Sequence, residues 1–126
     1  MQKNEIDEIV TARLNDAEFL LESSRFDGSV YLCGYAIELG LKSRICKILQ
    51  WEKYPTSGKY STFKTHDLDV LLHLTGLEDT VKLQYMTEWS IVAQWNPEAR
   101  YKPIGSVKEA DAKDMLDSVK ELIKLL

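Results

Sequence analysis

Apolar residues recur with a helical period along most of the sequence, and this pattern constrains the fold more than any other feature. From Ile6 to Leu21 they return every three or four positions, and a second apolar pattern runs from Ser29 to about Gln50. Such spacing places apolar side chains along one face of an α-helix. No segment alternates apolar and polar residues in the way that is typical of strands. The sequence therefore predicts an all-α fold.

Turn-forming residues divide this pattern into separate helices. Residues 27–29 read Asp-Gly-Ser and supply a turn and an N-cap before the second helix, while residues 106–109 match a capping box. Pro97 and Pro103 exclude a helix interior across 94–105. We expect an up-and-down antiparallel bundle of four to five helices, near 3–25, 29–50, 67–75, 78–93 and 106–126.

The length of 126 residues suits one domain, so residues 1–126 are expected to form a single helical bundle. The longest apolar stretch, Val30 to Ile37, is eight residues, whereas a membrane span needs about 20. The N-terminal residues are acidic, unlike a signal peptide. We therefore expect a cytoplasmic protein that does not enter a membrane.

The expected second helix contains two glycines and two cysteines. Gly34 and Gly40 each disfavour a helix interior by about 1 kcal/mol relative to alanine, unless another element approaches closely there. Cys33 and Cys46 lie thirteen residues apart, a rise of roughly 20 Å, so they share neither a disulfide nor a metal ion. Both are expected to be reduced thiols.

The two histidines do not indicate a metal site. His66 and His73 would stand about 10 Å apart on one helix, too far to bind the same ion. His66 is interpreted as the cap of the third helix. The sequence also lacks glycine-rich phosphate loops and a GxSxG nucleophile motif. No metal, cofactor or catalytic residue is predicted on this basis.

Glu38 is a carboxylate within the most apolar helix, and a buried charge is costly without a partner. Lys42 lies four residues later, in the favourable orientation for an ion pair, and Arg100 is the alternative partner. A structural ion pair is the favoured interpretation. A role for Glu38 as a catalytic acid or base is the other.

Positive charge is concentrated in residues 42–64, although the whole chain carries a net charge of −4. This segment contains one acidic residue, Glu52, and six basic ones: Lys42, Arg44, Lys47, Lys53, Lys59 and Lys64. Part of it, residues 51–64, contains proline, glycine and hydroxyl residues and is predicted to be a loop. The charges fit either a solvated lysine-rich stretch that also complements a helix dipole or a contact for an anionic ligand.

Aromatic residues alternate with these lysines, which suits bases stacked beside phosphates as well as an acidic protein partner. The aromatic residues are Trp51, Tyr54, Tyr60 and Phe63. The candidate ligand-contacting residues are Lys42, Arg44, Lys53, Lys59, Tyr60, Lys64, Arg100 and Tyr101.

Four blocks of sequence together resemble the HEPN domains (higher eukaryotes and prokaryotes nucleotide-binding). They are residues 12–17 before an apolar stretch, the Tyr31–Lys42 segment ending in Glu-x-x-x-Lys, Thr65-His66-Asp67-Leu68, and Glu98-Ala99-Arg100-Tyr101. The resemblance implies a four-to-five-helix bundle that frequently dimerises. It also implies a toxin–antitoxin or defence setting beside a minimal nucleotidyltransferase.

Many HEPN domains are metal-independent ribonucleases with an Arg-x4-6-His motif. The arginines of this chain are Arg13, Arg25, Arg44 and Arg100, and none has a histidine at the required spacing. The ribonuclease activity is therefore not carried over by the resemblance.

Two hypotheses about function remain. The first is a non-catalytic HEPN-like module that binds a nucleotide, RNA or a separate nucleotidyltransferase, as a homodimer. The second is a ribonuclease or nucleotide-processing enzyme with a divergent site that uses Arg100, Tyr101, Glu38 or His66.

Overall fold

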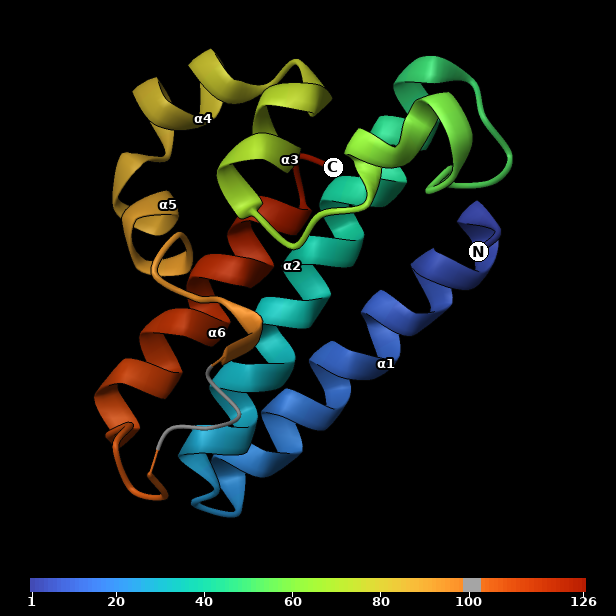
Figure 1. Ribbon diagram of the computed structural model, residues 1–126. Helices are drawn as coiled ribbons and strands as arrows, with labels where there is room; N and C mark the ends of the chain where they lie inside the picture. The colour runs from blue at the N-terminus through green and yellow to red at the C-terminus, as the bar shows by residue number, and fades with distance from the viewer. Residues whose placement is uncertain (99–102) are drawn as a thin grey trace.

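The structure, a computed structural model, describes residues 1–98 and 103–126, and this part of the chain is helical (Figure 1). Its elements are α1 (Lys3–Glu22), α2 (Phe26–Leu49), the 3-10 helix η1 (Gly58–Phe63), α3 (Leu68–Thr75), α4 (Glu78–Gln84), α5 (Met86–Val92) and α6 (Glu109–Ile123). Extended pairing in the described residues is limited to one bridge between Gln2 and Lys53. The predicted all-α fold is confirmed.

Helix α2 is the central element, and α1, α3 and α6 all pack against it. Helices α1 and α2 run antiparallel along their length, whereas α6 runs in the same general direction as α2 (Figure 1). Helix α6 starts at the end where α2 begins, since Gly105 and Val107 just before it donate hydrogen bonds to Asp27. The bundle is therefore not strictly up-and-down.

The helix expected over 78–93 is divided at Tyr85, whose φ of −128° and ψ of 33° leave the helical region. Val81 before the break and Trp89 after it are both buried. The expected single helix is therefore two short helices, each of which contributes a buried side chain to the core.

Two helices begin at residues other than the expected ones. Helix α2 begins at Phe26, and Ser29 donates its hydroxyl to the Ala17 carbonyl of α1 at 2.7 Å. Helix α6 begins at Glu109 rather than near Ser106, and the Asp111 carboxylate accepts the N–H of Lys108. These local interactions hold α2 against α1 and fix the start of α6.

Asp27 connects the start of α2 to the segment that precedes α6. Its carboxylate accepts the N–H of Gly105 at 2.6 Å and the N–H of Val107 at 3.0 Å. These two bonds hold residues 105–107 against the start of α2.

The core follows the apolar side of α2, where Ile37, Leu41 and Ile45 are fully buried. Gly34 and Gly40 of α2 both face a close neighbour, since a Cβ at Gly34 would overlap the indole of Trp95 and one at Gly40 would lie 3.6 Å from Ile123 of α6. The expected close approach of another helix is therefore found at Gly40, whereas at Gly34 a side chain from the segment after α5 approaches. No helix in the described part of the chain combines the length and the apolar character needed to cross a membrane.

Both cysteines of α2 are buried and reduced. Burial raises the pKa of the Cys33 thiol to about 12 and also raises the pKa of Cys46. A thiolate, the reactive form, is therefore disfavoured at both positions.

Candidate functional site

A buried carboxylate on α2 lies at the centre of a polar cluster in the bundle. Glu38 is 2% exposed, and each of its oxygens has a partner. Oε1 lies 2.8 Å from Nδ1 of His66, and Oε2 accepts a hydrogen bond from Nζ of Lys42 at 3.1 Å. Two donors thus offset the desolvation of the carboxylate. Arg100 and Tyr101, the other expected neighbours, lie outside the described residues.

The turn before α3 directs His66 towards Glu38. Asp67 is the N-cap of α3, and its Oδ1 accepts the N–H groups of Asp69 and Val70. The Thr65 hydroxyl accepts the N–H of Asp67. The prediction that His66 caps α3 was therefore wrong: Asp67, a preferred N-cap residue, takes that role, and the imidazole is available to Glu38.

The pairing with Glu38 fixes which nitrogen of His66 carries the proton. A carboxylate only accepts hydrogen bonds, so the neutral imidazole is protonated at Nδ1 and has its lone pair at Nε2. The His66 side chain is 59% exposed, and it lines a hollow of about 430 Å³ together with Asp67, Asp69, Gln94, Trp95, Asn96 and Pro97. The lone pair of Nε2 is thus available as an acceptor at the edge of this hollow.

Lys42, the first residue of the basic segment, is occupied within the bundle. Its side chain is 13% exposed, bonds to Glu38 and lies 5.4 Å from the centre of the Tyr54 ring. Arg44 is half-buried. These two candidates are less accessible to a ligand than the lysines that follow.

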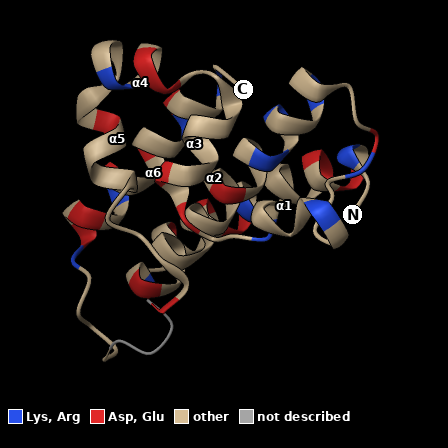
Figure 2. Cartoon of the chain, turned by 45° about the horizontal axis from the view of Figure 1, so that its top comes forward, with Lys and Arg blue, Asp and Glu red and all other residues tan. Residues whose placement is uncertain are grey.

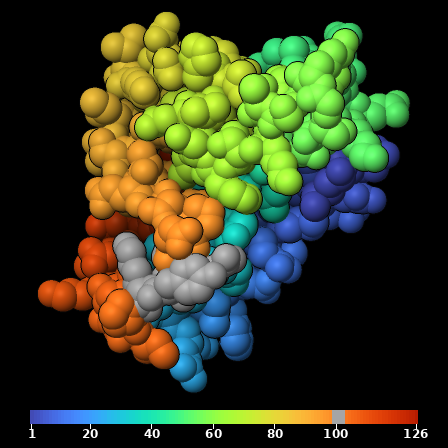
Figure 3. All heavy atoms as spheres, viewed as in Figure 1, coloured from blue at the N-terminus to red at the C-terminus, as the bar shows by residue number. Residues whose placement is uncertain are grey.

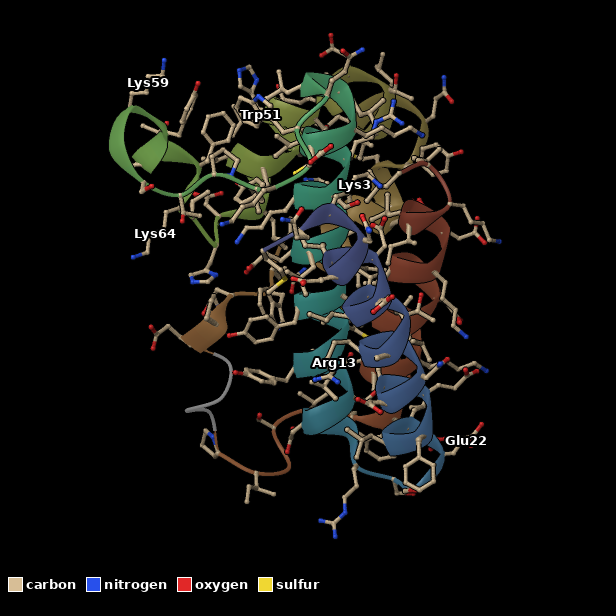
Figure 4. The ribbon with its side chains drawn as sticks, turned by 90° about the vertical axis from the view of Figure 1, so that its right-hand side faces the viewer. Lys3, Arg13, Glu22, Trp51, Lys59 and Lys64 are labelled. Carbon is tan, nitrogen blue, oxygen red and sulfur yellow. The ribbon has the colours of Figure 1, made fainter. Side chains whose placement is uncertain are left out.

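Lys53, Lys59 and Lys64 are exposed, and no carboxylate in the described residues lies within salt-bridge distance of them. Lys59 and Lys64 project from the same edge of the molecule (Figure 4). Basic positions also appear near the start of α1 and along the neighbouring loop in Figure 2. We call Lys53, Lys59 and Lys64, together with the Tyr60 ring, the basic loop surface.

The aromatic residues of this loop pack against one another edge to face. The Trp51 ring lies 5.2 Å from Tyr60 and 5.5 Å from Phe63, and Tyr54 lies 6.1 Å from Phe63. The Tyr54 hydroxyl donates to the Phe63 carbonyl, and burial raises the pKa of that hydroxyl. The cluster thus folds the loop, whereas Trp51 and Tyr60 remain half-exposed.

The first residues of the chain hold the other side of this loop. The N–H of Lys3 donates to the Glu52 carbonyl at 2.8 Å, and the N–H of Tyr54 donates to the Met1 carbonyl at 3.1 Å. In Figure 3 the atoms of the loop and of α3 form one continuous surface. The basic loop surface therefore rests on a packed base rather than on a free chain.

Residues 1–98 and 103–126 contain no group of three His, Cys, Asp or Glu side chains that could hold a metal ion.

The model of the HEPN domain family matches residues 9–126, which is nearly the whole chain. The chain belongs to the HEPN family. No curated protein and no solved structure matches it. Two of the sequence blocks that resembled HEPN domains meet in space, since Glu38 of one pairs with His66 of the other. The polar cluster and the basic loop surface therefore both lie within the matched HEPN domain.

Sequence reasoning did not identify the contact between Glu38 and His66. These residues are 28 positions apart, and no periodic pattern relates them. The signal that could have indicated a shared site is their presence in two blocks of one family resemblance.

Proposed function

We propose that this HEPN domain is a non-catalytic binding module that holds a nucleotide or nucleic acid against the basic loop surface. The observation that carries the proposal is the exposure of Lys53, Lys59 and Lys64, without acidic partners in the described residues, on a loop fixed by its aromatic cluster. The lack of an Arg-x4-6-His motif in the sequence supports a binding role rather than the family's cleavage reaction.

The distribution of charge supports an anionic ligand. The chain carries a net charge of −4, so its average field repels phosphate. The basic segment, however, contains six cationic side chains and only one carboxylate. Such a local excess attracts phosphates and favours association with polyanions. The half-exposed Trp51 and Tyr60 rings lie beside these cations, where a base can stack.

The experiment is a binding titration of a single-stranded RNA oligonucleotide and of ATP, followed by fluorescence anisotropy and calorimetry at several salt concentrations. Binding of RNA should weaken steeply as salt rises, because each neutralised phosphate releases counterions. Replacing Lys53, Lys59 and Lys64 with Ala should reduce the salt slope by about two, the effect of three fewer phosphate contacts on a single strand.

The matched control removes three lysines from the region of α6 instead: Lys108, Lys113 and Lys124 to Ala. It changes the net charge by the same amount and should leave RNA and ATP binding nearly unchanged. Equal losses in the two triple variants would assign the effect to net charge alone. Absence of RNA and ATP binding by the parent protein at low salt would reject the proposed function.

The same proposal includes a cytoplasmic setting beside a minimal nucleotidyltransferase, in a toxin–antitoxin or defence system, with the domain as a homodimer. Support comes from family membership and from exposed apolar side chains: Phe19, Leu83 and Met86 are more than half exposed. Light scattering at micromolar concentration should give the mass of a dimer. A nucleotidyltransferase encoded by an adjacent gene should copurify with the domain.

A second candidate, a ribonuclease with a divergent site, is favoured by one observation. Glu38 holds His66 through Nδ1, as the carboxylate of a catalytic triad holds its histidine. Incubation of RNA with the protein in the presence of a chelator tests this candidate. Cleavage that disappears in His66→Ala would favour it, and intact RNA would reject it.

A further inference from the structure

The hollow beside α3 is lined by hydrogen-bond acceptors on the α3 side and by the side chains of Gln94, Trp95 and Asn96, which also carry donors, on the other. His66 contributes Nε2, which has no hydrogen-bond partner in the described residues. Asp67 and Asp69 contribute carboxylates. One oxygen of each carboxylate is already used, since Asp67 Oδ1 caps α3 and Asp69 Oδ1 accepts the indole N–H of Trp89. The remaining acceptors suit a ligand group that donates hydrogen bonds.

Asp67 disfavours a phosphate in the hollow, because like charges at short range repel, whereas Lys82 lies 3.8 Å from Asp69 and partly offsets the second carboxylate. The basic loop surface is adjacent to the hollow in the sequence, since Lys64 precedes His66 by two residues. Two residues of extended chain span at most about 7 Å, the scale of one nucleotide. The backbone therefore brings a cation that suits phosphate within one nucleotide's length of the residue that carries the acceptor.

We propose that His66 Nε2 accepts a hydrogen bond from the ribose 2′-hydroxyl of a strand whose phosphates lie on the basic loop surface. The inference rests on the proposed function and makes it specific, since it names RNA rather than DNA as the preferred ligand. The 2′-hydroxyl is the donor that distinguishes the two backbones. Asp67 provides a second acceptor at the same edge of the hollow.

Glu38 is the positioning residue in this arrangement. It is buried and does not reach the ligand, but it keeps the proton on Nδ1 and the lone pair on Nε2. Gln in its place would donate an amide N–H to Nδ1 and move the imidazole proton to Nε2. The ring would keep its position, while the atom facing the ligand would change from an acceptor to a donor. The corresponding replacement of a catalytic triad's aspartate by asparagine leaves the geometry intact but changes the tautomer of the histidine.

The test compares three single-stranded probes of one sequence: RNA, 2′-fluoro RNA and DNA, at pH 8 and low salt. The 2′-fluoro probe retains an RNA-like sugar conformation but has no 2′ donor. The parent protein should bind RNA about three- to tenfold more tightly than either analogue, the effect of one neutral hydrogen bond. Equal binding of RNA and 2′-fluoro RNA would overturn the inference, even if DNA bound more weakly.

Three variants locate the effect. His66→Asn keeps a donor for Glu38 but lacks Nε2, and Glu38→Gln reverses the tautomer, so both should bind all three probes equally. His73→Asn is the matched control, because His73 is an exposed histidine on α3, 3.7 Å from Glu78, outside the hollow. It should keep the preference for RNA. Preference for RNA that persists in His66→Asn would overturn the inference.

The outcomes also separate this inference from the proposed function. No binding of any probe by the parent protein rejects the proposed function. Binding of all three probes with equal affinity, weakened by removal of the three lysines, keeps the proposed function and rejects the role of His66. Circular dichroism of each variant should match that of the parent, since none of the three substitutions removes an apolar core side chain.

Discussion

The two sides of α2 differ in how their stability is built. One side of α2 is apolar, and Ile37, Leu41 and Ile45 are fully buried there. Another side carries Glu38 and Lys42, whose buried charges pair with each other and with the exposed His66 from another segment. The apolar side depends on filled volume, whereas the polar side depends on complete pairing. Substitutions on the two sides should therefore follow different rules.

The largest loss of stability is expected on the apolar side. Ile37→Ala removes a fully buried side chain and leaves a cavity, so the free energy of unfolding should fall by about 2–5 kcal/mol. Urea denaturation followed by circular dichroism measures this change. Leu83→Ala is the control, since Leu83 is 83% exposed and its removal should have little effect. A similar loss for both variants would contradict the assigned core.

On the polar side, the free energy of unfolding should depend more on whether every buried polar group keeps a partner than on whether position 38 carries a carboxylate or an amide. Glu38→Ala leaves Lys42 largely buried without its partner, and the free energy of unfolding should fall by about 3 kcal/mol. Glu38→Gln retains an acceptor for Lys42 and a donor for His66, so it should cost clearly less. The same urea titrations compare the two. Equal losses would show that charge, rather than hydrogen bonding, stabilises this side.

The smallest effect is expected at His66. Its side chain is 59% exposed, so its interaction with Glu38 is weakened by solvent, and His66→Ala should lower the free energy of unfolding by less than about 1 kcal/mol. Thermal denaturation should show only a small decrease in Tm. A loss as large as that of Glu38→Ala would give His66 a structural role that its exposure does not indicate.

The same difference explains what could be predicted from the sequence. Helices α1, α2 and α3 were located within a few residues because their apolar spacing is local. Lys42 is placed beside Glu38 by the i+4 geometry of one helix. His66 approaches from 28 residues away, through a turn capped by Asp67, and no local rule indicates that contact.

A helix break and a helix start also differ from what local patterns indicate. Tyr85 interrupts an otherwise continuous helical pattern, with Val81 buried before the break and Trp89 buried after it. Ser29 would be a good cap, but its hydroxyl donates to the Ala17 carbonyl of α1. At the start of α2, packing between helices thus decides between alternatives that local propensity leaves nearly equal in energy.

The pairing of the first residues with the basic loop has a practical consequence for binding measurements. Gln2 is bridged to Lys53, and the Met1 carbonyl accepts the N–H of Tyr54. A purification tag fused ahead of Met1 would therefore emerge beside Lys53, and a polyhistidine or acidic tag would compete there with an oligonucleotide. Affinities for nucleotides and RNA should be measured after such a tag has been removed.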